Sequence, residues 1–310
     1  MTVTTQSQPN AKTQPAADKQ VWVDGKLVPQ AQAVVSVFDH GVLYGDGVFE
    51  GIRVYNGRIL KLATHLKRLD ESARSIRLTM PYGADELAAA CRAACKANGI
   101  INGYIRLCVT RGAGTLGLNP FACPKPTTFI IADTIQLYPQ ELYDKGLAVI
   151  TSSIVRSHPA SLSPRIKSLN YLSNILAKIE AIDAGVLEAV MLNPQGYVAE
   201  CTGDNLFIVR PCHGVPTLLT PPLHAGVLEG VTMNMVIELA KQLDIPFQHQ
   251  DLVRHDLYTA DEMFLTGTAA EVIPVTSIDK RTIGDGTPGA VTQRLIAAFR
   301  ELVADNAPED

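Results

Sequence analysis

Short apolar runs separated by turn residues fill the first part of the chain. In KQVWVDGKLVP the pair Asp24–Gly25 separates two such runs, and Asn56–Gly57 separates two more within the glycine-rich stretch 36–62. Asp-Gly and Asn-Gly pairs are typical of two-residue hairpin turns, because both central positions of these turns have positive φ. The sequence therefore predicts that the fold begins near residue 20 with β-hairpins.

Further along, the apolar residues change to helical spacing. Apolar positions three and four apart predict an amphipathic helix over 64–78, with Thr64 as its cap. A second helix over 84–98 and strands over 103–112 and 127–135 are predicted to follow. The first half of the chain is thus expected to mix strands with helices.

The stretch 164–185 has the clearest helical pattern. Gly185 supplies a stop, and one helical face carries Leu172, Ile175, Leu176, Ile179 and Ile182. The apolar run 146–155 before it predicts a strand. Lys167 is therefore expected in a loop between a strand and a helix, where rigid elements can aim a side chain into a cleft.

Antiparallel strands are predicted on either side of the turns at 193–196 and 202–205. Glu200 lies in one of these apolar strands, where a carboxylate is costly unless a cationic or protonated group faces it. A helix is predicted over 231–244, and its first N–H groups offer a site for an anion. The stretch 266–268 places threonines and a glycine between a strand and a turn, as a further set of donors.

The length of 310 residues, with 46% hydrophobic and 19% charged residues, is typical of a soluble globular protein with two domains. The expected organisation is a loose tail over 1–19, a small N-terminal domain over 20–136, a linker over 137–146 and a large C-terminal domain over 147–310. The tail is rich in Gln, Thr, Pro and Ala and has neither the apolar core of a signal sequence nor arginine.

The formal net charge of -4 gives no general attraction to nucleic acid or to an anionic membrane. No run approaches the 18 or more apolar residues of a membrane span, so a cytoplasmic location is expected. The six cysteines include no CxxC pair and the seven histidines no HExxH motif. Reduced thiols and no metal site are therefore expected.

Several features of the chain together meet the needs of pyridoxal phosphate. Its aldehyde forms an imine with a lysine, its phosphate needs backbone donors and an arginine, and its pyridine nitrogen needs a carboxylate. The chain offers Lys167, Tyr171 four residues on, Glu200, the start of helix 231–244 and Arg68. Each feature alone is a weak signal, because most lysines and arginines are solvated surface charges.

In order and separation the motifs of the chain resemble those of the class IV aminotransferases, which are pyridoxal phosphate enzymes of fold type IV. The resemblance rests on SVFDHGVLYGDGVFEGIR, HLKRLDESA, YIRLCVTRGAGTLGLNP, RIKSLNYLSNILAKIEA, YVAECTGDNLF, GVLEGVT and FLTGTAAEVIPV. These strings look most like branched-chain amino acid aminotransferases. The resemblance implies an α/β (α+β) fold of two domains, like that of D-amino acid aminotransferase, with the cofactor at the domain interface.

By this resemblance Lys167 holds pyridoxal 5'-phosphate covalently and moves the proton during the reaction. Tyr171 is expected to hydrogen-bond the phenolate oxygen of the cofactor, Glu200 to pair with its ring nitrogen, and Leu228 to pack on the ring. The phosphate is expected to be held by Arg68, Val231, Thr232 and Thr268.

The resemblance also implies the substrates and the partners. The expected reaction is the reversible ping-pong transfer of the amino group of L-leucine, L-isoleucine or L-valine to 2-oxoglutarate, which gives L-glutamate. The loop 112–120 reaches toward a neighbouring subunit in such proteins, so a homodimer or larger homo-oligomer is implied. The substrate is expected among Tyr44, Phe49, Gly51, Tyr104 and Arg106, with its α-carboxylate at the N–H groups of Thr268 and Ala269.

Two departures from the family pattern leave further substrates open. The lysine motif is KSLNY rather than KxGGNY, and GVLEGVTM lacks the arginine that commonly follows the threonine. The shorter lysine loop is also seen in D-amino acid aminotransferases, while VFEGIR, YIR and GTAAE favour the branched-chain enzymes. The sequence is also compatible with an (R)-selective amine transaminase, an aminodeoxychorismate lyase, a vitamin B6-binding protein without turnover and a purely structural domain.

Overall fold

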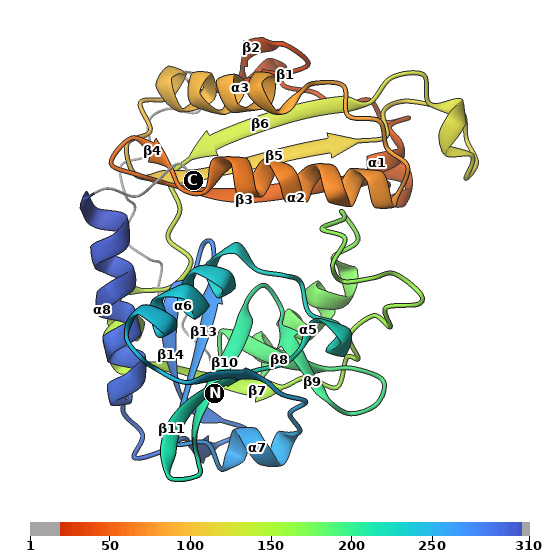
Figure 1. The fold of residues 1–310 in the computed structure, drawn as a ribbon. Coiled ribbons are helices and arrows are strands. Elements are labelled where there is room, and N and C mark those ends of the chain that lie inside the picture. The colour runs from red at the N-terminus through yellow and green to blue at the C-terminus, as the bar shows by residue number, and fades with distance from the viewer. Residues whose placement is uncertain (1–18, 306–310) are drawn as a thin grey trace, which may run out of the picture.

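The computed structural model describes residues 19–305, which form an N-terminal sheet and a C-terminal sheet with their helices, one above the other in Figure 1. The N-terminal sheet has the order β2-β1-β6-β5-β3-β4, and its strands are antiparallel. Its strands are β1 (Gln20–Val23), β2 (Lys26–Pro29), β3 (Gly47–Tyr55), β4 (Arg58–Ile59), β5 (Gly103–Thr110) and β6 (Thr127–Asp133).

The predicted hairpin turns are confirmed. Asp24 and Gly25 have φ of 45° and 93° and join β1 to β2, while Asn56 and Gly57 have φ of 51° and 80° and join β3 to β4. Positive φ at both central positions is what these residue pairs favour. These two residue pairs therefore correctly predicted the pairing of β1 with β2 and of β3 with β4.

Helices α2 (Leu62–Ser75) and α3 (Ala84–Ala97) pack on the N-terminal sheet through one apolar core. Both were predicted, but the predicted cap Thr64 lies inside α2, and Lys61 with φ of 53° is the N-cap residue. A short helix, α1 (His40–Tyr44), was not predicted. Its start is capped by Asp39, which accepts a hydrogen bond from the Gly41 N–H.

The C-terminal sheet has the order β12-β11-β10-β13-β14-β7-β8-β9, with β15 on β14. Its strands are β7 (Leu147–Thr151), β8 (Glu188–Leu192), β9 (Val198–Cys201), β10 (Asn205–Cys212), β11 (Val215–Thr220), β12 (Phe247–His249), β13 (Glu262–Gly267), β14 (Glu271–Ile278) and β15 (Arg281–Thr282). The helices of this half are α4 (Gln140–Lys145), α5 (Leu172–Asp183), α6 (Val231–Gln242), α7 (Arg254–Tyr258) and α8 (Ala290–Asp305). Short 3-10 turns lie at Gln30–Gln32 and Pro120–Ala122 in the N-terminal half and at Leu223–Ala225 in the C-terminal half.

Two predictions for this half were wrong in detail. The strand predicted over 146–155 ends at Thr151. The antiparallel pair β8 and β9 is confirmed, but β10 pairs with β11 and β13 instead of β9. The Cys201 N–H donates to the Asp204 carbonyl, so the turn closes locally and the chain leaves it toward β13. The turn residues in the sequence indicate that the chain reverses direction, but not with which strands the next strand pairs.

The helix predicted after Lys167 is confirmed as α5, and Gly185 follows it with φ of 77°. Its apolar face, however, is largely left exposed by the other described residues. Leu172 is 68% exposed and Ile182 is 61% exposed. The helical spacing therefore predicted the helix and its apolar face, while the surroundings of that face differ from those of α2.

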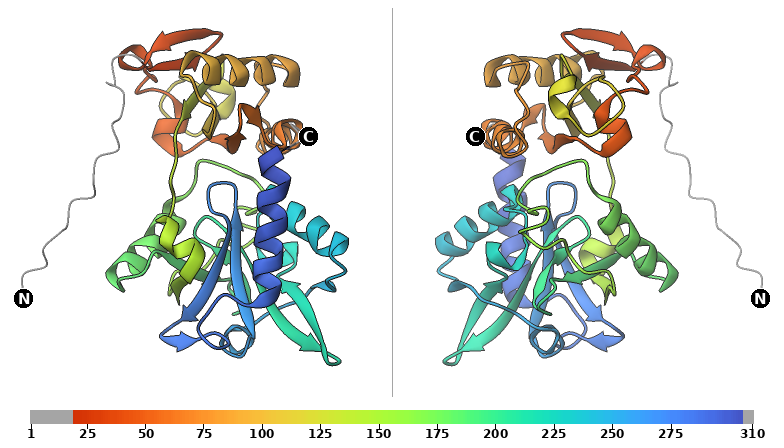
Figure 2. Two further views of the ribbon diagram at one scale, coloured as in Figure 1. Left: turned by 90° about the vertical axis from the view of Figure 1, so that its left-hand side faces the viewer. Right: turned by 90° about the vertical axis from the view of Figure 1, so that its right-hand side faces the viewer.

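The two halves meet at several points. The chain crosses between them after β6, and α4 lies within the predicted linker 137–146. Figure 2 shows α8 running along the C-terminal half and ending beside the N-terminal half, where the Ala304 carbonyl accepts a 2.6 Å hydrogen bond from Asn56 Nδ2. The predicted tail lies outside the described residues apart from Lys19, which pairs with Asp133 at 2.6 Å.

Within residues 19–305, no helix has both the length and the apolar character needed to cross a membrane. The same residues contain no group of three or more His, Cys, Asp or Glu side chains arranged to hold a metal ion. All six cysteines are free thiols.

Candidate active site

A cavity of about 520 Å³ lies between the two sheets. Strands β3 and β5 line it from the N-terminal half, and the lysine loop, α5 and the β13–β14 turn line it from the C-terminal half. It brings together many of the residues expected from the sequence, namely Phe49, Gly51, Tyr104, Arg106, Lys167, Tyr171, Thr268 and Ala269.

Lys167 is anchored to the opposite half of the molecule by its backbone. The Phe49 N–H donates to the Lys167 carbonyl at 3.0 Å, and the Leu169 N–H donates to the Gly47 carbonyl at 3.0 Å. The lysine loop therefore runs along the first residues of β3. The Lys167 Nζ lies 4.8 Å from the centroid of the Phe49 ring and 6.0 Å from that of Tyr171.

Aromatic rings form one wall of the cavity. The Phe49 and Tyr171 rings meet edge to face with centroids 5.2 Å apart, and the Arg106 guanidinium lies 4.6 Å from the Phe49 centroid. Gly51 allows the Tyr104 ring to cross β3, because a Cβ at position 51 would lie 1.7 Å from the Tyr104 hydroxyl. An L side chain at this position would displace Tyr104 from the cavity.

Glu200 is 5% exposed and is held by three donors. Its Oε1 accepts from Arg156 Nη2, and its Oε2 accepts from the Leu228 N–H at 3.0 Å and from Asn205 Nδ2 at 3.1 Å. Burial raises the pKa of the Glu200 carboxyl, while the Arg156 charge and the Leu228 N–H oppose that rise. The cationic partner that this strand carboxylate requires is therefore Arg156.

Arg68 is fixed by a buried carboxylate. Its Nε and Nη2 donate to Glu50 at 2.7 and 2.8 Å, and its Nη1 donates to the Glu229 carbonyl at 2.7 Å. His65 Nδ1 lies 2.7 Å from the same carboxylate. Burial alone would raise the pKa of Glu50, but the charges of Arg68 and His65 outweigh it and hold that pKa well below its usual range.

The start of α6 lies beside Arg68. Gly230 is its N-cap and supplies no side-chain acceptor for the first N–H groups of the helix, those of Val231 and Thr232 among them. Arg68 and Val231 both line a second cavity of about 300 Å³. A cation and a helix N-terminus thus converge, and each independently favours an anion.

The remaining predicted residues are placed as follows. Leu228 is tied to Glu200 by its N–H, and Thr268 lies in the turn after β13. Tyr44 is not brought to the cavity of its own chain, because it lies on α1, 38% exposed, with its hydroxyl accepting from the Gly117 N–H at 2.9 Å.

Four further residues were not predicted from the sequence, although each contacts a predicted residue or its partner: Glu50, His65, Arg156 and Asn205. For Glu50 a signal was available, since a charged residue between Phe49 and Gly51 in an apolar strand needs a partner as Glu200 does. For Arg156 and Asn205 the sequence carries no such signal.

The residues present fit pyridoxal phosphate. Arg68 uses three of its five N–H groups on Glu50 and Glu229, so two donors remain for a phosphate. Glu200 accepts three hydrogen bonds and has about four acceptor positions, so it can accept one more N–H. The Thr266 hydroxyl, opposite Asn205 in the sheet, is buried and has no hydrogen-bond partner among the described residues.

A pair of buried carboxylates, Asp204 and Glu188, lies at another part of the cavity wall. The Tyr138 hydroxyl lies 3.1 Å from Asp204 Oδ2 and 3.3 Å from Glu188 Oε2 and has one proton to donate to either, and Lys178 Nζ lies 3.2 Å from Glu188. Burial and the neighbouring Glu188 charge raise the pKa of Asp204 to about 7, against the opposing effects of Tyr138 and Lys178.

This shift predicts a pH-dependent stability. In the unfolded chain an aspartate ionises near pH 3.9, whereas the folded chain keeps the Asp204 proton up to about pH 7. Between these values the unfolded state binds fewer protons, so the free energy of unfolding falls as pH rises. We expect Asp204→Asn to be more stable than wild type above pH 7 and to lose less stability between pH 4 and 7. Urea unfolding at pH 5 and 8 measures this, and a variant whose difference from wild type is the same at both pH values would contradict it.

Comparison with known proteins finds matches that cover most of the chain. Residues 47–278 match the family described as amino-transferase class IV. A protein of Methanocaldococcus jannaschii, named as an inferred branched-chain-amino-acid aminotransferase, is 46% identical over 282 residues, which cover 91% of this chain and 96% of that protein.

Two solved structures are similar over nearly the whole chain. The branched-chain amino acid aminotransferase of Escherichia coli has a TM-score of 0.90 and 35% identity, covering 94% of this chain and 97% of that one. The branched-chain amino acid aminotransferase of Thermobaculum terrenum, solved in its PLP (holo) form, has a TM-score of 0.82 and 32% identity, covering 96% of each chain.

Proposed function

The chain belongs to the class IV aminotransferases, and we propose that it transfers the amino group of L-leucine, L-isoleucine or L-valine to 2-oxoglutarate. As a member of this family it is a pyridoxal phosphate-dependent transaminase with the two-domain fold type IV architecture. The observation that supports the proposal most is a lysine amine, Lys167 Nζ, 4.8 Å from an aromatic ring in a cavity between the two sheets.

We propose the following residues for the cofactor. Arg68, the N–H groups of Val231 and Thr232, and Thr268 would hold its phosphate; Tyr171 would hydrogen-bond its phenolate oxygen and Leu228 would pack on its ring. When bound, pyridoxal phosphate supplies an aldehyde carbon that takes the amino group and a ring that accepts the electron pair of a broken bond. Glu200 would accept a hydrogen bond from the protonated ring nitrogen and stabilise its charge, and Arg156 would fix the orientation of the Glu200 carboxylate.

Lys167 would act twice. Its Nζ would hold the cofactor covalently at rest and, once released, would take the proton from the substrate Cα and deliver it to C4′, the aldehyde carbon of the cofactor. The contacts with β3 at residues 167–169 support this role, because they restrict where the amine can move.

The substrate would lie against β3 and β5. Phe49, Gly51 and Tyr104 offer an apolar and aromatic surface to a branched side chain, and the N–H groups of Thr268 and Ala269 would meet the α-carboxylate. Arg106 is a cation in the same cavity and would bind the second carboxylate of 2-oxoglutarate. One cavity would thereby accept both an apolar and an acidic substrate.

We propose a homodimer or larger homo-oligomer. Leu116 and Leu118 of loop 112–120 are 73% and 80% exposed, and the apolar face of α5 is exposed as well. Exposed apolar patches mark interaction surfaces. Tyr44, which contacts this loop, would then reach the cavity of a neighbouring subunit. Sedimentation equilibrium tests this directly, and a monomer at micromolar concentration would contradict it.

The amino donor is tested by steady-state kinetics with a panel of L- and D-amino acids and 2-oxoglutarate. We expect L-leucine, L-isoleucine and L-valine to have the highest kcat/KM values. Turnover of D-alanine without turnover of L-leucine would favour a D-amino acid aminotransferase. Turnover of (R)-amines would favour an (R)-selective amine transaminase, and release of pyruvate from aminodeoxychorismate would favour the lyase.

We also propose the cytoplasm as the location. All six cysteines are unpaired, and Cys91, Cys108 and Cys201 among them are buried. Free thiols in this number suit a reducing compartment.

A further inference from the structure

One face of β3 continues beyond the cavity. Side chains alternate along a strand, so Phe49 and Gly51, which line the cavity, share a face with Arg53 and Tyr55. Both Arg53 and Tyr55 reach Glu271 of the C-terminal half. Arg53 Nη2 lies 2.8 Å from Glu271 Oε1, and the Tyr55 hydroxyl donates to the same oxygen at 2.7 Å.

Glu271 has an unusual backbone conformation. It is the first residue of β14, directly after the turn that contains Thr268 and Ala269, and it pairs with Gly267 across that turn. Its φ is 60°, in the left-handed region that residues other than glycine seldom adopt. Such conformations persist where the surrounding contacts hold them. The bonds from Arg53 and Tyr55 are contacts of that kind.

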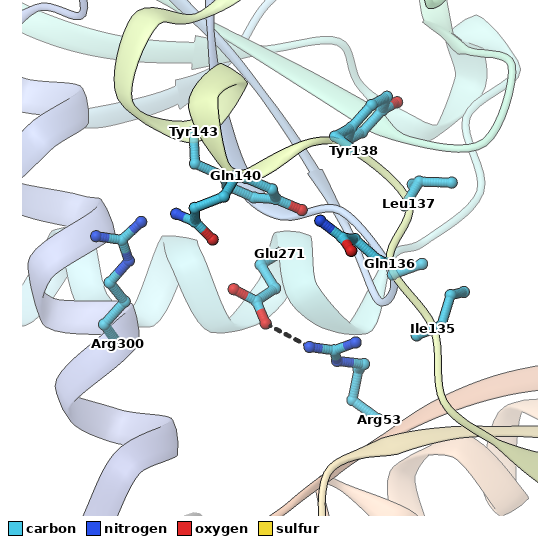
Figure 3. A pocket seen from close by; sticks show the side chains of 10 residues that line it. Arg53, Ile135, Gln136, Leu137, Tyr138, Gln140, Tyr143, Glu271 and Arg300 are labelled. Atoms are coloured by element: carbon cyan, nitrogen blue, oxygen red, sulfur yellow. Dashed lines mark hydrogen bonds and ion pairs between the residues drawn. The ribbon is translucent and has the colours of Figure 1, made fainter. Parts of the chain in front are cut away.

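The turn lies between two cavities. Ala269 lines both the 520 Å³ cavity of Lys167 and a cavity of about 390 Å³ that Arg53 and Glu271 line. Figure 3 shows the Arg53–Glu271 pair in this second cavity, with Arg53 reaching it from the N-terminal half. The side chains of the pair are only 17% and 21% exposed, so water screens their attraction less than at the surface.

We infer that Arg53, Tyr55 and Glu271 are positioning residues, which fix the Thr268–Ala270 turn against β3 so that its N–H groups face the α-carboxylate of the substrate. This inference rests on the proposed function, which places that carboxylate at Thr268 and Ala269. The strand that lines the side-chain pocket and the turn that binds the carboxylate are thereby held in one geometry. Loss of the contacts from Arg53 and Tyr55 to Glu271 would move the N–H groups of the turn without removing them.

The test is the affinity of the holoenzyme for two carboxylates that cannot react. Acetate carries only the carboxylate, and 4-methylvalerate adds a branched chain. Titrations follow the absorbance of the bound cofactor in wild type, Arg53→Met, Glu271→Gln and the double variant. We expect each single variant to raise both dissociation constants about tenfold, because a small displacement of aligned donors is costly. The double variant should bind the carboxylates no more weakly than the single variants, because each single substitution already breaks the same ion pair.

A matched control is Arg210→Met. Arg210 forms an ion pair with Asp256 whose side chains are 31% and 17% exposed, and neither residue lines the cavity of Lys167. This variant should leave both dissociation constants unchanged. Tyr55→Phe keeps the ion pair and should raise both constants about threefold, on the scale of one hydrogen bond, which provides a test if the charge variants do not fold.

Two results would overturn the inference. One is carboxylate affinity within twofold of wild type in Glu271→Gln or Tyr55→Phe. The other is a lower melting temperature and weaker cofactor retention with unchanged carboxylate affinity, as a purely structural link would give. Failure of the proposed function looks different, because wild type would then bind 4-methylvalerate no better than acetate, whatever the variants do.

Discussion

Lys167→Ala is expected to lower kcat by on the order of 10³-fold or more, because it removes both the covalent attachment and the proton-transferring amine. The phosphate site around Arg68 and the α6 start does not involve Lys167, so the variant should still bind pyridoxal phosphate. The measurement is the single-turnover rate with L-leucine together with the absorbance spectrum of the bound cofactor. We expect a bound cofactor without the imine band.

Lys178→Ala is the matched control for this variant. Lys178 lines the same cavity, but it pairs with Glu188 at 3.2 Å. Its loss should leave the covalent attachment intact. A Lys167→Ala protein that keeps wild-type turnover, or a Lys178→Ala protein that loses the imine band, would exclude Lys167 as the catalytic residue.

Glu200→Gln is expected to lower kcat by about 10² to 10³, or roughly 3 to 4 kcal/mol, on the scale of one preorganised electrostatic contact. Glutamine is nearly isosteric, but its single side-chain oxygen can accept either from Arg156 or from the Leu228 N–H and Asn205, not from both sides. It also carries no charge to stabilise a protonated ring nitrogen. The loss should therefore appear in kcat with little change in cofactor affinity. Pre-steady-state kinetics of the half-reaction with L-leucine measure it.

Glu180→Gln is the control for charge loss alone. Glu180 lies on α5 and accepts from Ser152 and Ser153 away from the cavity, so its kcat should equal that of wild type. Glu200→Asp should recover part of the activity, because the charge returns at a longer distance. Equal rates for Glu200→Gln and wild type would show that the ring nitrogen does not depend on this carboxylate.

Local patterns predicted most of the secondary structure. The Asp24–Gly25 and Asn56–Gly57 hairpins follow from residues that tolerate positive φ, and α2 follows from apolar spacing. Such signals depend on a few neighbouring residues. The partner of β10 depends on the whole sheet, and no residue near the turn at 202–204 determines it.

The apolar face of α5 is a second feature whose surroundings the local sequence does not determine. Spacing alone identifies apolar residues on one helical face, but it does not say what covers them. Ile175 and Ile179 are 54% and 47% exposed, whereas Leu66 and Leu69 of α2 are 6% and 0% exposed. A helix that packs on its own sheet and a helix that meets another chain can have the same sequence pattern.

For the site, the sequence indicated the residues whose chemistry is unusual and missed those that hold them. Glu200 was recognised because a carboxylate in an apolar strand is costly, but Arg156, which faces it, lies in a loop where an arginine needs no explanation. Glu50 holds Arg68 from the opposite face of β3 to Phe49. Contacts of this kind join segments far apart in the chain, so they become visible only in the fold.

The most direct test of the account is reduction of the holoenzyme with borohydride, followed by peptide mapping. Reduction converts the imine between lysine and cofactor into a stable bond, so the modified peptide identifies the lysine. We expect the adduct on Lys167, in the peptide that precedes α5. An adduct on Lys178 or any other lysine, or none at all, would contradict it.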